Sequence, residues 1–156
     1  MRVHLCAVGR LRAGPERELI DDYLTRFDRT GRGLGLGPAT VHEVEDRRGG
    51  GPAAEAALLA RVLPAGGVTV AFDERGRSLS SPEFATELAR FRDAGRQDLA
   101  LVIGGADGLA GEMRDGADLV LSLGRMVWPH MLVRVMVAEQ LYRAASILAG
   151  APYHRA

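Results

Sequence analysis

The sequence predicts a single α/β domain built on a parallel sheet. Segments with the alternation of a strand and segments with the spacing of a helix follow one another along the chain. Three of the strand segments, Val68 to Phe72, Leu99 to Ile103 and Leu119 to Leu123, are almost continuously apolar. Such strands are typical of a parallel sheet with helices on both faces. The chain of 156 residues fits one domain, and no linker or internal repeat divides it.

The first half of the chain predicts two strand-helix units. We expect, in order, a strand, a helix, a loop, a strand and a helix over Val3 to Val8, Pro15 to Phe27, Arg29 to Pro38, Thr40 to Val44 and Pro52 to Leu63. Apolar residues recur at helical spacing in the first helix, behind a proline at a first-turn position. Four glycines and a proline predict the loop, and a further proline ends the alanine-rich second helix.

In the second half, the strand at Val68 to Phe72 is followed by a predicted turn at Asp73 to Gly76. A helix then begins with Ser81 as its cap, Pro82 at its first position and Glu83 in its first turn, and it runs to about Ala94. Two further strands, at the apolar segments already named, precede a last helix.

That last helix, Met131 to Leu148, is apolar nearly all round in its first half. One sheet face cannot bury such a helix, so a second surface must cover it. A twofold homodimer is the simplest explanation, and a central position within one domain is the alternative. Arg134 lies among apolar residues, and if buried it needs an ionic partner, either Glu139 or a residue of a second copy.

The residue usage excludes several classes of enzyme. All twenty basic residues are arginine, so the chain has no lysine for a Schiff base or a phosphate-binding P-loop. Its one cysteine, Cys6, excludes an internal disulfide and an iron–sulfur cluster, and alone it cannot build a structural zinc site. We therefore expect no metal.

The charge is neutral overall but unevenly placed. Twenty acidic residues balance the arginines, yet residues 121–156 carry four arginines against one acid, so a polyanion should meet that end. No apolar run approaches the ~20 residues of a membrane span, and the N-terminus does not resemble a signal peptide. We expect a cytoplasmic protein without a membrane partner.

Two segments after strands are candidates for a ligand site. Gly104 and Gly105 follow a strand, where bare N–H groups can meet a ligand, although a plain tight turn explains them as well. The segment Leu121 to His130 is unusually apolar for a loop, so it covers either a ligand such as an adenine ring or ordinary core. His130 is expected to cap or pack rather than act as a base.

The C-terminal tail is a third candidate. Tyr153, His154 and Arg155 combine a stacking group, a proton carrier and a phosphate ligand, as a nucleotide contact needs. The alternative is a tail packed on its own domain.

Taken together, these segments resemble the RlmH family of ribosomal RNA large subunit methyltransferases, within the SPOUT class. The likeness rests on LVIGGADG at Leu101 to Gly108, LSLGRMVWPHMLVRVMVAEQLYRA at Leu121 to Ala144, and PYHR at Pro152 to Arg155. It implies an α/β fold with a deep C-terminal trefoil knot, and a homodimer with the active site between subunits. The implied reaction uses S-adenosylmethionine and no metal, and it methylates N3 of a pseudouridine in helix 69 of 23S rRNA in the assembled 70S ribosome.

The resemblance also implies site residues. Expected cofactor contacts are Phe72, Gly104, Gly105, Leu123, Gly124, Arg125, Met126, Val127, Trp128 and Pro129. We expect His154 to serve as base or proton relay, Arg143 and Arg155 to bind phosphate or a developing anion, and Tyr153 to stack or shape the site. Two other hypotheses remain at this point: a nucleotide-binding oxidoreductase on the same kind of sheet, and a noncatalytic ribosome-binding module.

Overall fold

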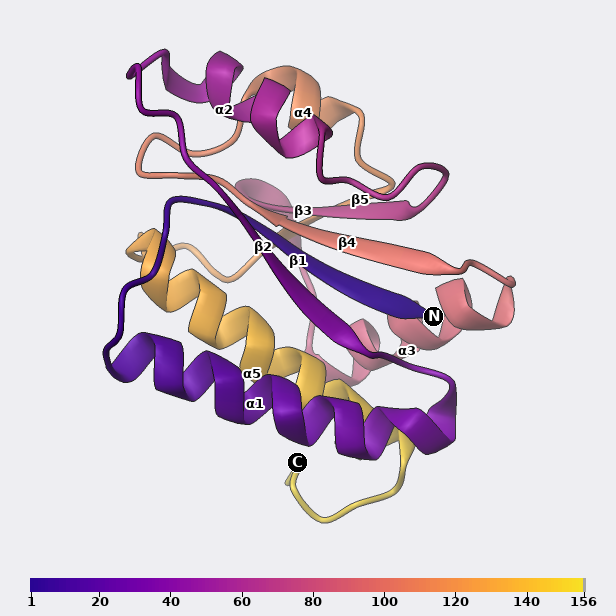
Figure 1. Ribbon diagram of the computed structural model, residues 1–156. Coiled ribbons are helices and arrows are strands. Elements are labelled where there is room, and N and C mark those ends of the chain that lie inside the picture. Colours follow the sequence, from indigo (N-terminus) through magenta and orange to yellow (C-terminus); the bar gives the residue numbers. More distant parts are fainter. Residues whose placement is uncertain (156) are drawn as a thin grey trace.

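The computed structural model describes residues 1–155, which form a five-stranded parallel sheet between two layers of helices (Figure 1). The elements, in chain order, are β1 (Arg2–Val8), α1 (Pro15–Gly31), a 3-10 turn (Arg32–Leu34), β2 (Ala39–Val44), α2 (Gly51–Ala60), β3 (Val68–Ser78), α3 (Ser81–Asp93), β4 (Asp98–Ile103), α4 (Gly111–Asp115), β5 (Leu119–Ser122) and α5 (His130–Leu148). The predicted α/β class and parallel sheet are confirmed.

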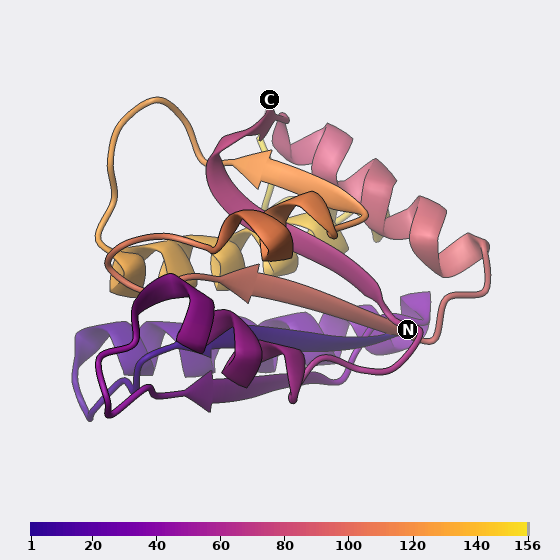
Figure 2. The ribbon, with the colours of Figure 1, turned by 90° about the horizontal axis from the view of Figure 1, so that it is seen from above.

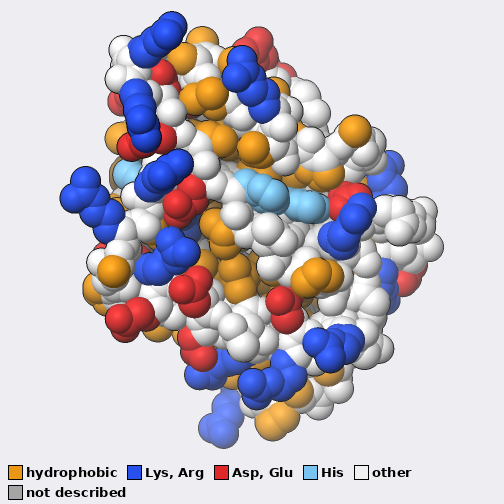
Figure 3. All heavy atoms as spheres, viewed as in Figure 1, with side chains coloured by type: hydrophobic (Ala, Val, Ile, Leu, Met, Phe, Trp, Pro, Cys, Tyr) orange, Lys and Arg blue, Asp and Glu red, His pale blue; other side chains and the backbone are white. Residues whose placement is uncertain are grey.

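The strands lie in the order β2-β1-β4-β3-β5 and all pairs are parallel. Their carboxyl ends therefore meet at one edge of the sheet, where ligands bind in open α/β folds. Helices α1, α3 and α5 cover one face, and α2 and α4 cover the other (Figures 1 and 2). In a space-filling view along the direction of Figure 1, basic and acidic side chains are interspersed over the visible surface (Figure 3).

Alternation along the strands builds a core on each face. In β1, Val3, Leu5 and Ala7 pack toward α1, α3 and α5, while Cys6 and Val8 pack toward the opposite face. All of β4 is buried, as a central parallel strand requires.

Within residues 1–155, no helix is both long enough and apolar enough to cross a membrane. The same residues contain no group of three or more histidine, cysteine or carboxylate side chains that could hold a metal ion.

The prediction that a loop begins at Arg29 is wrong, because α1 continues to Gly31 and a 3-10 turn follows. Gly31 does not end the helix at Arg29 but allows close packing against the chain that follows. A Cβ at this position would lie 2.7 Å from the backbone oxygen of Leu36, so only glycine lets the chain fold back here.

The predicted turn at Asp73 to Gly76 is also wrong, because these residues belong to the long strand β3. The pairing of β3 with β5 shifts register between Phe72 and Arg77, which marks a bulge. A Cβ on Gly76 would lie 2.5 Å from the backbone of Leu121, so this glycine lets the bulged strand stay against β5. These polar residues have the composition of a turn because they lie in the bulge and not in the core.

The cap of α3 lies one residue earlier than predicted. The Ser80 hydroxyl accepts from the Glu83 backbone N–H, and the Glu83 carboxylate accepts from the Ser80 N–H, which completes a capping box. Ser81 donates instead to the Gln140 side chain on α5. The short helix α4 was not predicted.

Helix α5 lies against α1 and α3, and its second half is buried within one copy of the chain at Val137, Ala138, Leu141, Ala144 and Ala145. This part fits the alternative of a helix central to the domain. Met131 and Leu132 in the first turn remain exposed, so the apolar start of the helix is left uncovered.

Arg134 is 1% exposed, and of its two expected partners, Glu139 or a residue of a second copy, Glu139 is wrong. Its guanidinium lies 3.3 Å from a Glu43 carboxylate oxygen and donates to the backbone oxygens of Val8 and Gly9. Glu139 is five positions along the helix, about 140° around it, and therefore lies on another side. Arg134 thus joins the start of α5 to the carboxyl ends of β1 and β2.

A cluster of two histidines and an aspartate, away from the carboxyl ends of the strands, predicts a loss of stability in mild acid. His4 lies between His42, at 3.1 Å, and Asp98, at 2.8 Å. Burial and the neighbouring His4 lower the pKa of His42. Because the unfolded chain then binds more protons, the contribution of His42 is complete above the unfolded pKa of about 6.5 and is lost as the pH falls from there through the folded pKa.

Urea unfolding at pH 7.5 and 5.5 should therefore show a lower free energy of unfolding at pH 5.5, and His42→Gln should reduce this difference. An unchanged difference in the variant would assign the acid sensitivity elsewhere, for example to His130, whose pKa burial also lowers.

Candidate functional site

A cavity of about 700 Å³, called the first cavity below, opens at the carboxyl ends of β4 and β5, beside the bulge of β3. It lies at the sheet edge that the parallel topology favours for a ligand. It is lined by residues 72–75, residues 103–109, residues 121–124 with 126–129, and His130 and Val133 of α5.

The glycine pair after β4 forms both a tight turn and a wall of this cavity, so its two interpretations are compatible. The Gly108 N–H donates to the Gly105 oxygen at 3.1 Å, and Gly108 has a φ of +78°. A Cβ on Gly104 would lie 2.6 Å from the carbonyl carbon of Gly108. Only glycine at position 104 allows the chain to close so tightly on itself.

The apolar loop after β5 lines the other side of the cavity. Val127 is 89% exposed and Met126 is 73% exposed, so these side chains do not cover a core within one copy of the chain. Of the two interpretations of this loop, the exposure of these side chains favours a surface that binds a ligand or a partner over ordinary core packing.

Nine of the ten residues expected to contact the cofactor line the first cavity. The exception is Arg125, whose side chain is exposed and is not part of the lining. Its neighbours Gly124 and Met126 do line the cavity. The contacts of all ten residues with a cofactor stay a prediction.

Three acidic residues of the cavity are not among the site residues predicted from the sequence. Asp73, Glu74 and Asp107 all line it. Asp73 is near Arg114, at 3.8 Å, and Asp107 helps to raise the pKa of Glu55, after the larger effect of burial. The place of Asp107 beside the two glycines could have identified it as a site residue. Asp73 and Glu74 lie in a segment whose composition predicts a turn, so no signal in the sequence identified them. These three acids outnumber Arg75, which also lines the cavity, and therefore favour a ligand that carries positive charge.

His130 lines the first cavity at the start of α5. Of its two expected roles, capping is wrong, since the cap residue is Pro129 and no side chain makes a cap hydrogen bond. His130 is half-buried, which agrees with the packing alternative. Burial, followed by the charge of Arg134, lowers the pKa of His130.

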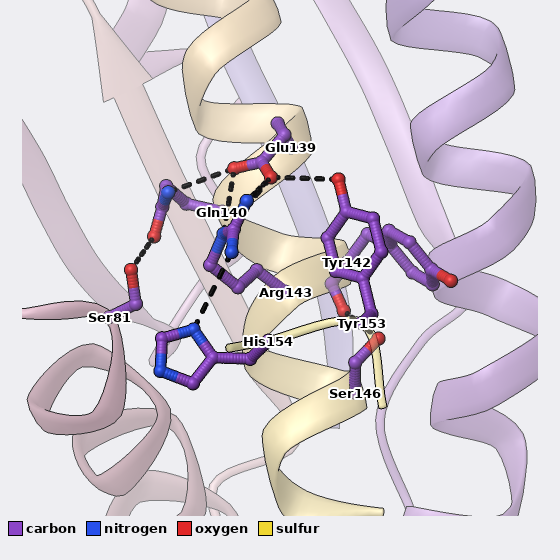
Figure 4. Close-up of polar contacts among 8 residues, drawn as sticks. All are labelled: Ser81, Glu139, Gln140, Tyr142, Arg143, Ser146, Tyr153 and His154. Atoms are coloured by element: carbon purple, nitrogen blue, oxygen red, sulfur yellow. Dashed lines mark hydrogen bonds and ion pairs between the residues drawn. The ribbon is translucent and has the colours of Figure 1, made fainter. Parts of the chain in front are cut away.

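The tail residues meet on α5 around Glu139 (Figure 4). Arg143 Nε donates to the Glu139 carboxylate at 3.0 Å, and the Tyr153 hydroxyl donates to the same carboxylate at 2.9 Å. The Arg143 guanidinium lies 4.9 Å from the centre of the Tyr153 ring and 3.5 Å from His154 Nδ1. Glu139, which organises this group, was not among the expected site residues.

Two of the three tail side chains therefore pack on their own domain. The Tyr153 ring also lies 4.5 Å from the ring of Tyr142. Burial and the Glu139 carboxylate raise the pKa of Tyr153, which keeps its hydroxyl protonated. Arg155 is exposed, so its charge is presented to solvent.

Within one chain, the tail residues do not line the first cavity. A second cavity of about 500 Å³ lies between the first cavity and the cluster of tail residues around Glu139. It shares Phe72 and residues 121–124 with the first cavity, and Glu139 and Gln140 line its other side.

Comparison with known proteins adds independent information. Residues 1–154 match the family model described as "Predicted SPOUT methyltransferase". The chain is 70% identical over 155 residues to "Ribosomal RNA large subunit methyltransferase H" of Dinoroseobacter shibae, and 71% identical to the protein of that name from Cereibacter sphaeroides strain ATCC 17025. Each alignment covers 99% of both chains.

A solved structure described as a probable methylase family protein from Haemophilus influenzae Rd KW20 has a similar fold. The TM-score is 0.52 at 12% identity, and the alignment covers 99% of this chain and 70% of the other.

Proposed function

The chain belongs to the SPOUT methyltransferase family, and from that premise we propose that it methylates the 23S rRNA of the large ribosomal subunit. The observation that carries this proposal is the identity of about 70%, over nearly the full length, to relatives named as ribosomal RNA large subunit methyltransferases. The oxidoreductase hypothesis finds no support in this family.

We propose that S-adenosylmethionine binds in the first cavity, and the residues present fit it. Leu123, Met126, Val127 and Trp128 offer apolar surface for an adenine ring, while the acids of the cavity suit the positive charges of the amine and sulfonium. The glycine turn exposes backbone amides where a Cβ would obstruct a close approach. When bound, this donor supplies an activated methyl group for direct displacement.

The proposed target is N3 of a pseudouridine in helix 69, in the assembled ribosome. A pyrimidine imide must lose its proton, and the tail offers groups for this step. We assign proton transfer to His154 and anion or phosphate binding to Arg143 and Arg155, with Tyr153 as a stacking or shaping group. Glu139 supports this assignment because it fixes Arg143 and Tyr153 in one cluster.

We propose that the active protein is a homodimer. Met126, Val127, Trp128, Met131 and Leu132 are all at least 39% exposed and lie near the first cavity. Such a patch favours association with a second copy. A dimer would also let a tail from one copy approach the first cavity of the other, whose lining includes no tail residue of its own chain.

The proposed fold includes the deep trefoil knot of the family, formed as the C-terminal segment threads beneath the loops of the first cavity. Helix α5 begins beside those loops and continues between α1 and α3, which places the C-terminal segment on the opposite face from α4 (Figure 2). A ribosomal substrate also places the proposed activity in the cytoplasm.

Calorimetric titration tests the donor assignment. The protein should bind S-adenosylmethionine at one site per chain and should not bind NAD. A protein that binds rRNA but not S-adenosylmethionine would be the noncatalytic module, and one that binds NAD instead would be a different enzyme.

His154→Ala should slow methyl transfer at saturating donor by about 100-fold, the lower end of what a positioned acid or base contributes. Single-turnover rates on ribosomes measure this effect directly, because product release does not limit them. His4→Ala, at the opposite edge of the sheet, is the matched control and should keep the parental rate. If His154→Ala also keeps it, His154 carries no proton in the reaction.

A further inference from the structure

The second cavity has the walls of a nucleobase pocket. Leu79, Val135 and Met136 supply aliphatic surface, and Tyr23 and Phe84 supply aromatic surface. Single-stranded bases bind proteins by stacking on such side chains. Phe72 and residues 121–124 separate this space from the first cavity, so a ring held here adjoins the proposed methyl donor.

A carboxamide is held at the polar end of this cavity (Figure 4). The Ser81 hydroxyl donates to Gln140 Oε1 at 2.7 Å, and Gln140 Nε2 donates to a Glu139 carboxylate oxygen at 2.8 Å. These two bonds fix which end of the amide is the acceptor and which is the donor. One lone pair on Oε1 and one hydrogen on Nε2 remain for a ligand.

An oriented acceptor beside a donor complements a ligand edge with an N–H next to a carbonyl. In uridine, that pairing exists only at N3, because the sugar occupies N1. In pseudouridine the sugar is on a carbon, so N1–H and the C2 carbonyl form a second edge of this kind. A pseudouridine can therefore bind a carboxamide through N1–H and C2=O while N3 remains free to react.

We propose that the second cavity receives the target base and that Gln140 selects pseudouridine over uridine by pairing with its N1–H and C2=O. This inference rests on the proposed function and adds the substrate site and its specificity-determining residue. Ser81 and Glu139 act as positioning residues, since they set the orientation of the carboxamide.

The test measures single-turnover methylation of ribosomes that carry either pseudouridine or uridine at the target position. The parental protein should methylate pseudouridine at least about tenfold faster, the value of roughly one hydrogen bond. Gln140→Leu should slow the pseudouridine reaction and bring the two rates within about twofold. Its affinity for S-adenosylmethionine, measured by calorimetry, should stay parental.

The chain provides a matched control in its other glutamine. Gln97 is exposed and lies directly before β4, and Gln97→Leu should keep the parental rates and preference. If Gln140→Leu keeps the preference, the assignment of Gln140 is wrong while the proposed function stands. If the parental protein methylates neither substrate, the proposed function itself fails.

Two further measurements do not depend on the Gln140 variant. The parental protein should methylate N1-methylpseudouridine no faster than uridine, and a parental rate on that base would refute reading of N1–H. Val135→Phe, which fills the cavity, should remove methylation while donor affinity and the sedimentation coefficient stay parental. Full activity in this variant would show that the cavity does not hold the base.

Discussion

Gly104→Ala is expected to weaken the binding of S-adenosylmethionine by at least about 100-fold and to abolish methylation at ordinary donor concentrations. The added Cβ would lie 2.6 Å, 2.7 Å and 2.8 Å from backbone atoms of Gly108 and Leu109. Backbone atoms cannot rotate away as a flexible side chain can, so the turn must open. Overpacking of this kind also costs about 1–3 kcal/mol of the free energy of unfolding. Calorimetry and urea unfolding measure the two effects.

Gly33→Ala is the control for this change. Gly33 lies in the 3-10 turn after α1, and a Cβ there would meet no atom within 4 Å. This variant should keep donor binding and nearly all of its stability. Parental donor affinity in Gly104→Ala would mean that the glycine turn does not shape the donor site.

Arg134→Met should lower the free energy of unfolding by about 3 kcal/mol, the cost of breaking a buried ion pair by removing one partner. The substitution leaves a Glu43 oxygen without its cation and the oxygens of Val8 and Gly9 without their donor. Methionine retains the apolar volume, so the effect reports the lost charge and hydrogen bonds and not a large cavity.

The same variant should also weaken donor binding, because Pro129, His130 and Val133 at the start of α5 line the first cavity and Arg134 holds that turn in place. Urea unfolding and calorimetry measure the effects, with the exposed Arg61→Met as control. A change of less than 1 kcal/mol in Arg134→Met would show that Glu43 and the two oxygens are satisfied without it.

The sequence predicted the fold where one periodicity acted alone. The continuous apolar run of β4 predicted a strand that is buried on both faces of the sheet. The helical spacing of apolar residues in α1 predicted a helix with one buried side. The extent of β3 could not be predicted, because its bulge depends on Gly76 meeting the backbone of Leu121, which is distant in sequence. The end of α1 could not be predicted for a different reason, because glycine usually ends a helix, whereas Gly31 packs against Leu36 after the chain turns.

Some residues of the candidate site could be predicted from the sequence, and others depend on contacts between distant segments. The glycine pair and the apolar loop mark the first cavity by residue type alone, and their backbone positions follow from the strand ends. The partner of Arg134 lies 91 positions away on β2, and only the assembled sheet brings it near. The role of Glu139 as the centre of the tail cluster depends likewise on the tail folding back along α5, and no local pattern shows this.

Mass spectrometry of 23S rRNA from cells that lack this protein tests the central claim most directly. We predict that one pseudouridine in helix 69 loses its methyl group, and that purified parental protein with S-adenosylmethionine restores it on ribosomes from those cells. An unchanged pattern of methylation in such cells, or no methyl transfer by the purified protein, would contradict the account.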